Sequence, residues 1–356
     1  TSQLVAIMDD SFSFNCTVLG STYVHSDLTG KVRAGYFPKT YGSWNCASSA
    51  GAHGDQVTAI ATAKQAGAGE TLGIMGVAGL ADIHISSYAV KGSETYHPDH
   101  WANATDDARS EGADVLNMSW GSNTILADDV QNYMSNNSVD AATAVSYQLT
   151  QLSLSSNSTS VNTWVTAMNN FQTAGGVIVQ SLSNSTSADD ADFLAAMPVY
   201  FSELAEAWIT AVNIDKTGSS GSYTYTRQSG ECGQTAQYCL GADGWNITVP
   251  AYTSGYASTW VNSGGTSFVA PQISGAVALL KEHFPNHSAE QLVDRLLASA
   301  DNSFFTRDGI VTFGNGVQHG YSDEFGHGIM DIYAALNPIT SDSLGQSIYT
   351  SNTQVG

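Results

Sequence analysis

The chain has 356 residues, of which 32 are acidic and 11 are basic, and its formal net charge is −21. This charge argues against nucleic acid and anionic membrane as partners, because both are themselves negatively charged. No stretch approaches the ~18 consecutive apolar residues of a membrane-spanning helix, so the sequence predicts no transmembrane segment. Only 12% of the residues are charged, and the abundance of Ser, Thr, Asn and Gly suits an extracellular protein.

The first predicted element is a buried strand that ends in carboxylates. Residues 4–8 are apolar, and Asp9 and Asp10 follow them directly. Thr1 lies almost directly before this strand, which predicts a processed N-terminus. The carboxyl ends of parallel strands are where α/β sheets hold their chemistry, so these acids are candidate functional residues.

A histidine stands at the start of the first predicted helix. Val57, Ile60 and Ala61 follow helical spacing, so His53 lies at or just before the first turn. An imidazole in that position can face a cleft.

Strands and helices alternate along the rest of the chain. The alternation predicts an α/β fold with a doubly wound, mostly parallel central sheet and helices on both faces. The predicted strands lie within residues 84–90, 113–121 and 176–184. The predicted helices lie at 98–110, at 273–280, and after the capping box of Ser288 and Gln291.

A serine stands between a glycine-threonine turn and the helix predicted at 273–280. Gly265 has no side chain, so a substrate chain can come close to the backbone there. The helix start beyond Ser267 directs free N–H groups and a partial positive charge at negative charge that develops beside the hydroxyl. A polar turn capping a helix would look the same in isolation. The segments upstream favour a nucleophile.

Together these segments resemble the subtilisin-type serine peptidases, in the chain order Asp, His, Ser. The matching segments are Asp9-Asp10, His53-Gly54, residues 117–121 (Asn-Met-Ser-Trp-Gly), Asn184 after an apolar strand, and Gly265-Thr266-Ser267. The resemblance implies a subtilisin-like fold and a secreted endopeptidase that works through an acyl-enzyme intermediate and requires no cofactor.

The resemblance also assigns roles to residues. Asp9 would orient His53, and His53 would take the proton from Ser267. Asn184 and the Ser267 N–H would form the oxyanion hole. The residues implied in substrate binding are Ser119, Trp120, Gly121, Ser183 and Gly265. Trp120 would line the pocket for the side chain before the scissile bond, or alternatively pack in the core.

The chain departs from the family pattern at three places. Asp9-Asp10-Ser11 lacks the family glycine, and a one-residue slip would make Asp10 the triad acid. We expect Asp9, because a slip turns the side chain to the other face of the sheet. Asp55-Gln56 replaces Thr-His, and Phe268-Val269 shifts the family alanine. Asp10 and Asp55 would favour basic residues in the substrate.

The second half of the chain resembles the subtilase passenger domains of bacterial autotransporters, in residues 197–213, 231–240 and 325–338. This resemblance implies a catalytic domain over 1–338, a tail or linker over 339–356, a secreted or cell-surface location and a C-terminal β-barrel translocator in the full-length protein.

Four cysteines allow three pairings. The expected pairs are Cys16 with Cys46, and Cys232 with Cys239, which spans a short turn and matches the autotransporter pattern. Four buried thiols in a cytosolic protein are the alternative.

Two further features concern the surface. Residues 122–172 are polar and low in charge, which predicts an inserted surface element beside the substrate cleft. Calcium sites are frequent in the family, and oxygen ligands are offered by Gln3, Asp27, Asp82, Asp99, Asp106 and Asp107. None of these has the spacing of a dedicated calcium loop, so solvated carboxylates are the alternative reading.

Two other functions compete with the subtilisin reading. One is a catalytically silent binding or adhesion module on the same scaffold. The other is a sedolisin-type peptidase, which uses carboxylates in place of histidine. His53-Gly54 after the first strand favours subtilisin chemistry.

Overall fold

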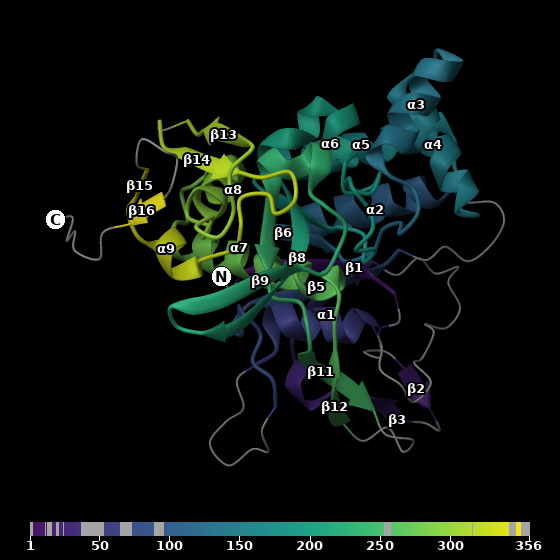
Figure 1. Ribbon diagram of the computed structural model, residues 1–356. Coiled ribbons are helices and arrows are strands. Elements are labelled where there is room, and N and C mark those ends of the chain that lie inside the picture. Colours follow the sequence, from purple (N-terminus) through teal and green to yellow (C-terminus); the bar gives the residue numbers. More distant parts are fainter. Residues whose placement is uncertain are drawn as a thin grey trace.

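The structure, a computed structural model, describes residues 3–10, 12, 16–18, 21–23, 25–36, 53–64, 73–88, 96–252, 258–314, 316–341 and 347–349. An eight-stranded sheet lies at its centre (Figure 1), in the order β10-β8-β7-β6-β1-β5-β4, with β9 paired to β8. Its strands are β1 Leu4–Asp9, β4 Val32–Tyr36, β5 Asp82–Ser87, β6 Val115–Met118, β7 Val177–Ser181, β8 Trp208–Ser219, β9 Ser222–Arg227 and β10 Cys239–Ala242. All its pairs are parallel except β8 with β9.

Helices cover both faces of this sheet, because its central strand is apolar on both sides. In β1, Val5 and Ile7 join one core cluster, whereas Leu4, Ala6 and Met8 join the other. The first cluster contains residues of α1 (His53–Thr62), α7 (Ala270–His283) and α8 (Ala289–Ala298). The second contains residues of α2 (His97–Ser110) and α5 (Ser158–Thr173). The predicted fold class is confirmed.

Smaller elements surround these layers. The remaining helices are α3 Ala127–Asn137, α4 Ala141–Gln151, α6 Met197–Tyr200 and α9 Ile332–Leu336, with 3-10 turns η1 Ser26–Leu28, η2 Ser202–Ala207, η3 Gly233–Tyr238 and η4 Thr266–Phe268. The two-stranded hairpins are β2 Cys16–Val18 with β3 Ser21–Tyr23, β11 Ile247–Tyr252 with β12 Ser258–Ser263, β13 Gly309–Thr312 with β14 Gln318–Tyr321, and β15 Ile339–Ser341 with β16 Ser347–Tyr349. No described helix is long and apolar enough to cross a membrane.

The polar segment 122–172 folds into three helices with different surroundings. α3 and α4 form the outer part (Figure 1), where the rings of Tyr133 and Tyr147 stack with centroids 3.9 Å apart. α5 instead lies against α2, with Trp164 fully buried. All three helices supply side chains to the same core cluster, among them Val130 of α3 and Val145 of α4, so the segment is only partly a surface element.

Several local predictions can be compared directly. Ser288 caps α8 in a capping box with Gln291, as the sequence predicts. Cys232 and Cys239 are joined by a disulfide across η3. Cys46 lies outside the described residues, and so does the side chain of Cys16, so that pairing stays a prediction.

Candidate active site

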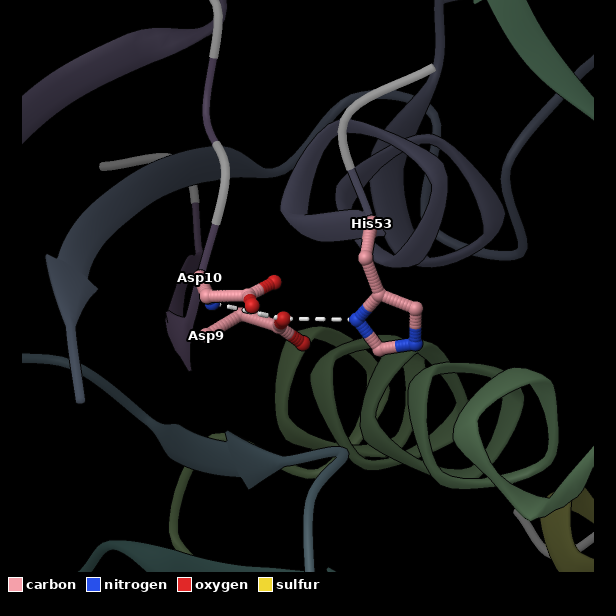
Figure 2. Close-up of side chains that lie close together, drawn as sticks. All are labelled: Asp9, Asp10 and His53. Atoms are coloured by element: carbon pink, nitrogen blue, oxygen red, sulfur yellow. Dashed lines mark hydrogen bonds and ion pairs between the residues drawn. The ribbon is translucent and has the colours of Figure 1, made fainter. Parts of the chain in front are cut away.

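β1 and α1 bring Asp9 and His53 together. Asp9 is fully buried at the end of β1, His53 opens α1, and Oδ1 of Asp9 lies 2.7 Å from Nδ1 of His53 (Figure 2). The N–H of Gly54 donates to the carbonyl of Asp10 at 2.9 Å. A Cβ at Gly54 would come within 2.5 Å of that carbonyl oxygen, so only glycine lets the strand end and the helix start meet.

Asp9 and His53 shift each other's pKa in opposite directions to the effect of burial. Burial by itself would lower the pKa of His53, but the Asp9 carboxylate, assisted by Asp10, raises it to about 9. Burial raises the pKa of Asp9 more than the contact with His53 lowers it. The pKa of His53 is raised because a carboxylate 2.7 Å away favours the imidazolium.

Asp10 does not replace Asp9 in this contact. Its N–H donates to Oδ1 of Asp9 at 2.7 Å, and its own Oδ2 accepts from the phenol of Tyr88 at 3.3 Å. The one-residue slip considered above is therefore not what the structure shows.

Ser267 lies in η4, immediately before α7, and is half-buried. Its Oγ donates to the carbonyl of Ser119 at 3.2 Å, and Oγ of Ser119 donates back to the carbonyl of Ser267 at 3.0 Å. Among the described residues Ser267 makes no hydrogen bond to His53. The imidazole nevertheless lies beside this turn, with its centroid 6.0 Å from the ring of Phe268.

A buried chain of hydrogen bonds supports the two serines. Asn117 in β6 donates through Nδ2 to Oγ of Ser119 at 2.9 Å. Its Oδ1 accepts from Oγ of Ser274, in α7, at 2.9 Å. The chain thus links the sheet to the helix that follows Ser267. No sequence pattern singled out Ser274, which is one of many serines in an apolar helix.

Asn184 is exposed, and its amide group is oriented by neighbouring backbone. Its Oδ1 accepts from the N–H of Thr266 at 2.9 Å and from Oγ1 of Thr266 at 3.0 Å. Nδ2 makes no hydrogen bond among the described residues and remains available as a donor. Gly265 has φ 148°, and a Cβ there would lie 2.9 Å from Oδ1 of Asn184, so the position requires glycine.

The two segments expected to bind substrate meet at Asn123, which the sequence reading missed. Its Oδ1 accepts from the N–H of Asn184 at 2.9 Å and from Oγ of Ser183 at 3.1 Å. Gly121 is exposed, two residues before it. Asn123 therefore connects the segment after β6 with the segment after β7.

The structure shows Trp120 packed in the core, and its role in substrate binding stays a prediction. The side chain is half-buried, and its Nε1 donates to the carbonyl of Met8 at 2.9 Å. Its ring lies 5.1 Å from Tyr88 and 4.8 Å from Trp101, measured between centroids. Packing thus fixes most of Trp120, and only part of it is left for contact with a substrate.

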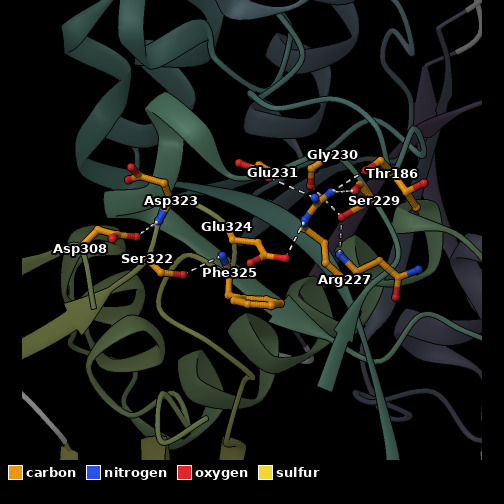
Figure 3. A network of polar contacts seen from close by, with 11 residues as sticks. Thr186, Arg227, Ser229, Gly230, Glu231, Asp308, Ser322, Asp323, Glu324 and Phe325 are labelled. Atoms are coloured by element: carbon orange, nitrogen blue, oxygen red, sulfur yellow. Dashed lines mark hydrogen bonds and ion pairs between the residues drawn. The ribbon is translucent and has the colours of Figure 1, made fainter. Parts of the chain in front are cut away.

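Arg227, near the C-terminal end of β9, anchors the loop after Asn184 (Figure 3). Its Nη1 donates to the carbonyl of Thr186 at 3.3 Å, two residues beyond Asn184. The same guanidinium contacts Glu231 at 3.1 Å and Glu324 at 3.4 Å. The loop is therefore held to the segment that carries the disulfide.

Metal ligands cluster at one place in the described part of the chain. Single ligand atoms of Asp9, Asp10 and His53 lie within 4.8 Å of one another, although Nδ1 of His53 already contacts Asp9. Several of the carboxylates named as calcium candidates have protein partners. Asp27 accepts from Trp260 and Ile74, Asp107 contacts His84, and Asp106 contacts Arg109. Calcium binding stays a prediction.

The model of the subtilase family matches residues 1–328. An extracellular serine protease of Serratia marcescens is 27% identical over 327 residues, covering 79% of this chain and 29% of that protein. The Neisserial autotransporter lipoprotein NalP of Neisseria meningitidis is 28% identical over 172 residues, or 45% of this chain and 14% of that protein. The chain thus spans less than a third of the length of these relatives.

Solved structures agree on the fold. Fervidolysin of Fervidobacterium pennivorans, a keratinolytic enzyme related to subtilisin, superimposes with a TM-score of 0.61 at 23% identity, over 94% of this chain and 42% of that one. Sphericase superimposes with a TM-score of 0.55 at 19% identity, over 92% of this chain and 93% of that one. At these identities the likeness establishes the architecture alone.

Proposed function

Because the chain belongs to the subtilase family, we propose that it is a secreted serine endopeptidase with Asp9, His53 and Ser267 as its catalytic triad. The observation that carries the proposal is the 2.7 Å contact between Oδ1 of Asp9 and Nδ1 of His53. It leaves Nε2 of the imidazole without a hydrogen bond among the described residues, on a side chain that is 35% exposed.

The proposed reaction begins when Ser267 turns from the carbonyl of Ser119 to Nε2 of His53. Oγ attacks the carbonyl carbon of the scissile bond as its proton passes to His53, and the buried Asp9 stabilises the imidazolium. The Nδ2 group of Asn184 and the N–H of Ser267 donate to the oxyanion. His53 then protonates the leaving amine, and water hydrolyses the acyl-enzyme by the reverse sequence of proton transfers.

Substrate binding would itself release Ser267 from its hydrogen bond to Ser119. In an extended peptide bound along residues 119–121, an N–H group of the substrate competes for the Ser119 carbonyl. Oγ of Ser267 donates to this carbonyl over 3.2 Å, which is long for a hydroxyl donor. Substrate binding would therefore free the hydroxyl at little cost.

Secretion is proposed on different grounds. The Serratia relative is described as extracellular and NalP as an autotransporter. The disulfide between Cys232 and Cys239 agrees with an oxidising compartment. Attachment to a translocator belongs to the same proposal.

Labelling with a fluorophosphonate tests this function. We expect one modified serine, Ser267, found by mass spectrometry of the labelled peptide, and no labelling or peptide hydrolysis by Ser267→Ala. A wild-type protein that is neither labelled nor active would indicate a silent binding module. Activity that peaks at about pH 3–4, where carboxylates titrate, would favour the sedolisin alternative.

A further inference from the structure

Asp192 is a buried acid that has no role in the proposed reaction. It is fully buried in the segment between β7 and α6 and forms a β-bridge with Leu126. Its Oδ1 accepts from the N–H groups of Leu194 at 3.2 Å and Ala195 at 3.3 Å. Oδ2 makes no hydrogen bond among the described residues.

The carboxyl group lies directly against both segments that are expected to bind substrate. A Cβ built on Gly121 would come within 2.9 Å of Oδ1 of Asp192. The backbone N–H groups of Ser122 and Ser183 also face the carboxyl group closely enough to lower its pKa. Ser122 directly follows Gly121, and Ser183 directly precedes Asn184. One buried side chain therefore lies close to the backbone of both segments.

We propose that Asp192 is a positioning residue that fastens the backbone at Gly121 and Ser122 to the backbone at Ser183, and so sets the spacing between the two substrate-binding segments. The inference rests on the proposed peptidase function. It adds a second connection to the one that Asn123 makes on the same segments. The backbone N–H groups of Ser122 and Ser183 face this carboxyl group, one from each segment, and the ionised carboxylate attracts both more strongly than the neutral acid does.

This arrangement makes substrate binding depend on pH. Burial raises the pKa of Asp192 to about 7, against the opposing effect of the surrounding N–H groups. The phenol of Tyr200 faces the same carboxyl group, and its pKa is raised by burial and then by Asp192, so it stays neutral. Asp192 is therefore the group that titrates here near neutrality. KM should fall as the pH rises through about 7, because the ionised carboxylate holds the N–H groups of both segments more strongly.

The test compares Asp192→Asn with Asp190→Asn. Asp190 is a matched control, because it is a buried acid of the same segment, yet its carboxylate accepts from the backbone and side chain of Gln234 in η3. Tetrapeptide p-nitroanilides that differ in the residue before the scissile bond serve as substrates. Active sites are counted by fluorophosphonate titration, so that misfolded protein does not affect kcat or KM.

We expect Asp192→Asn to raise KM about tenfold for every substrate, with a smaller effect on kcat, and to abolish the change of KM near pH 7. Asp190→Asn should keep the wild-type KM and its pH dependence. Gly121→Ala gives a second route, because its Cβ would displace the carboxyl group, and it should raise KM in the same way.

Three results would overturn the inference while the peptidase function stands. The first is an active wild-type enzyme whose KM does not change between pH 6 and 8, a range about one unit either side of the Asp192 pKa. The second is a KM for Asp192→Asn equal to that of Asp190→Asn. The third is a loss confined to substrates with lysine or arginine before the scissile bond, which would mean that Asp192 contacts the substrate itself. Absence of labelling and hydrolysis in the wild type would instead refute the function.

Discussion

The two sides of the candidate site are held in different ways, by a charged contact at His53 and by neutral hydrogen bonds at Ser267. Asp9 and His53 rest on one contact of 2.7 Å between a fully buried carboxylate and an imidazole. Ser267 and Asn184 are instead held through hydroxyl, amide and backbone groups. Because His53 must be neutral to act as the base, pH should change kcat through the His53 side. On the Ser267 side kcat should respond to the loss of single neutral partners, and pH should act there on KM through Asp192.

Removing the base should have the largest effect. His53→Ala leaves Ser267 without a proton acceptor, so we expect kcat to fall about 10⁴–10⁶-fold with KM little changed. Steady-state kinetics with a peptide substrate measure this. The variant should also lose the rise of kcat with pH, and a variant that keeps it would show that another group is the base.

The second largest loss of kcat is expected when the oxyanion donor is removed. Asn184→Ala takes away the Nδ2 group that Thr266 orients, and we expect kcat to fall about 10²–10³-fold with little change in KM. Asn184→Asp tests the same point, because it keeps an acceptor for Thr266 but no N–H donor, and it should be equally impaired. Normal kcat in either variant would mean that another group completes the oxyanion hole.

A smaller loss of kcat is expected when the buried hydrogen-bond chain that supports Ser119 is broken. Ser274→Ala leaves Oδ1 of the buried Asn117 without its partner, which costs about 1–3 kcal/mol of stability. Because Asn117 also holds Ser119, kcat should fall about threefold. Ser160→Ala is the control, since Ser160 is a buried hydroxyl in α5 whose loss should lower only the melting temperature. Equal kcat for both variants would show that the buried chain serves stability alone.

The smallest change should appear in the pH profile. His53 acts as a base only when neutral, so kcat/KM should rise as the pH increases through its pKa, which lies above 6.5 and reaches about 9 beside two carboxylates. Asp10→Asn removes one of these negative charges, so the rise should move to lower pH. Asp106→Asn, in which the changed acid lies on α2, should leave the profile in place. An upward shift for Asp10→Asn would contradict the assigned electrostatics.

The sequence predicted much of the site, because its strongest signals are local. An apolar run followed by carboxylates marked Asp9, helical spacing marked His53, and the turn before an apolar helix marked Ser267. Each of these patterns occupies about ten residues, and the order of the segments along the chain supplied the family resemblance. The boundaries of the polar segment 122–172 were less predictable, because α5 is polar by composition and buries Trp164 on only one of its faces.

The sequence was enough to predict the fold class, the family and the candidate residues at strand and helix ends. Which neutral side chains support these residues can be seen only in the folded structure. Asn123 and Asn184 are 61 residues apart, and Asn117 and Ser274 are 157 residues apart. No local periodicity connects such partners, because each hydrogen bond depends on which strands lie side by side in the sheet. Asp192 shows most clearly that the burial of a residue can depend on distant segments. It lies in an acidic run that looks like solvated surface, and only the packing of Gly121 against it shows that it is buried.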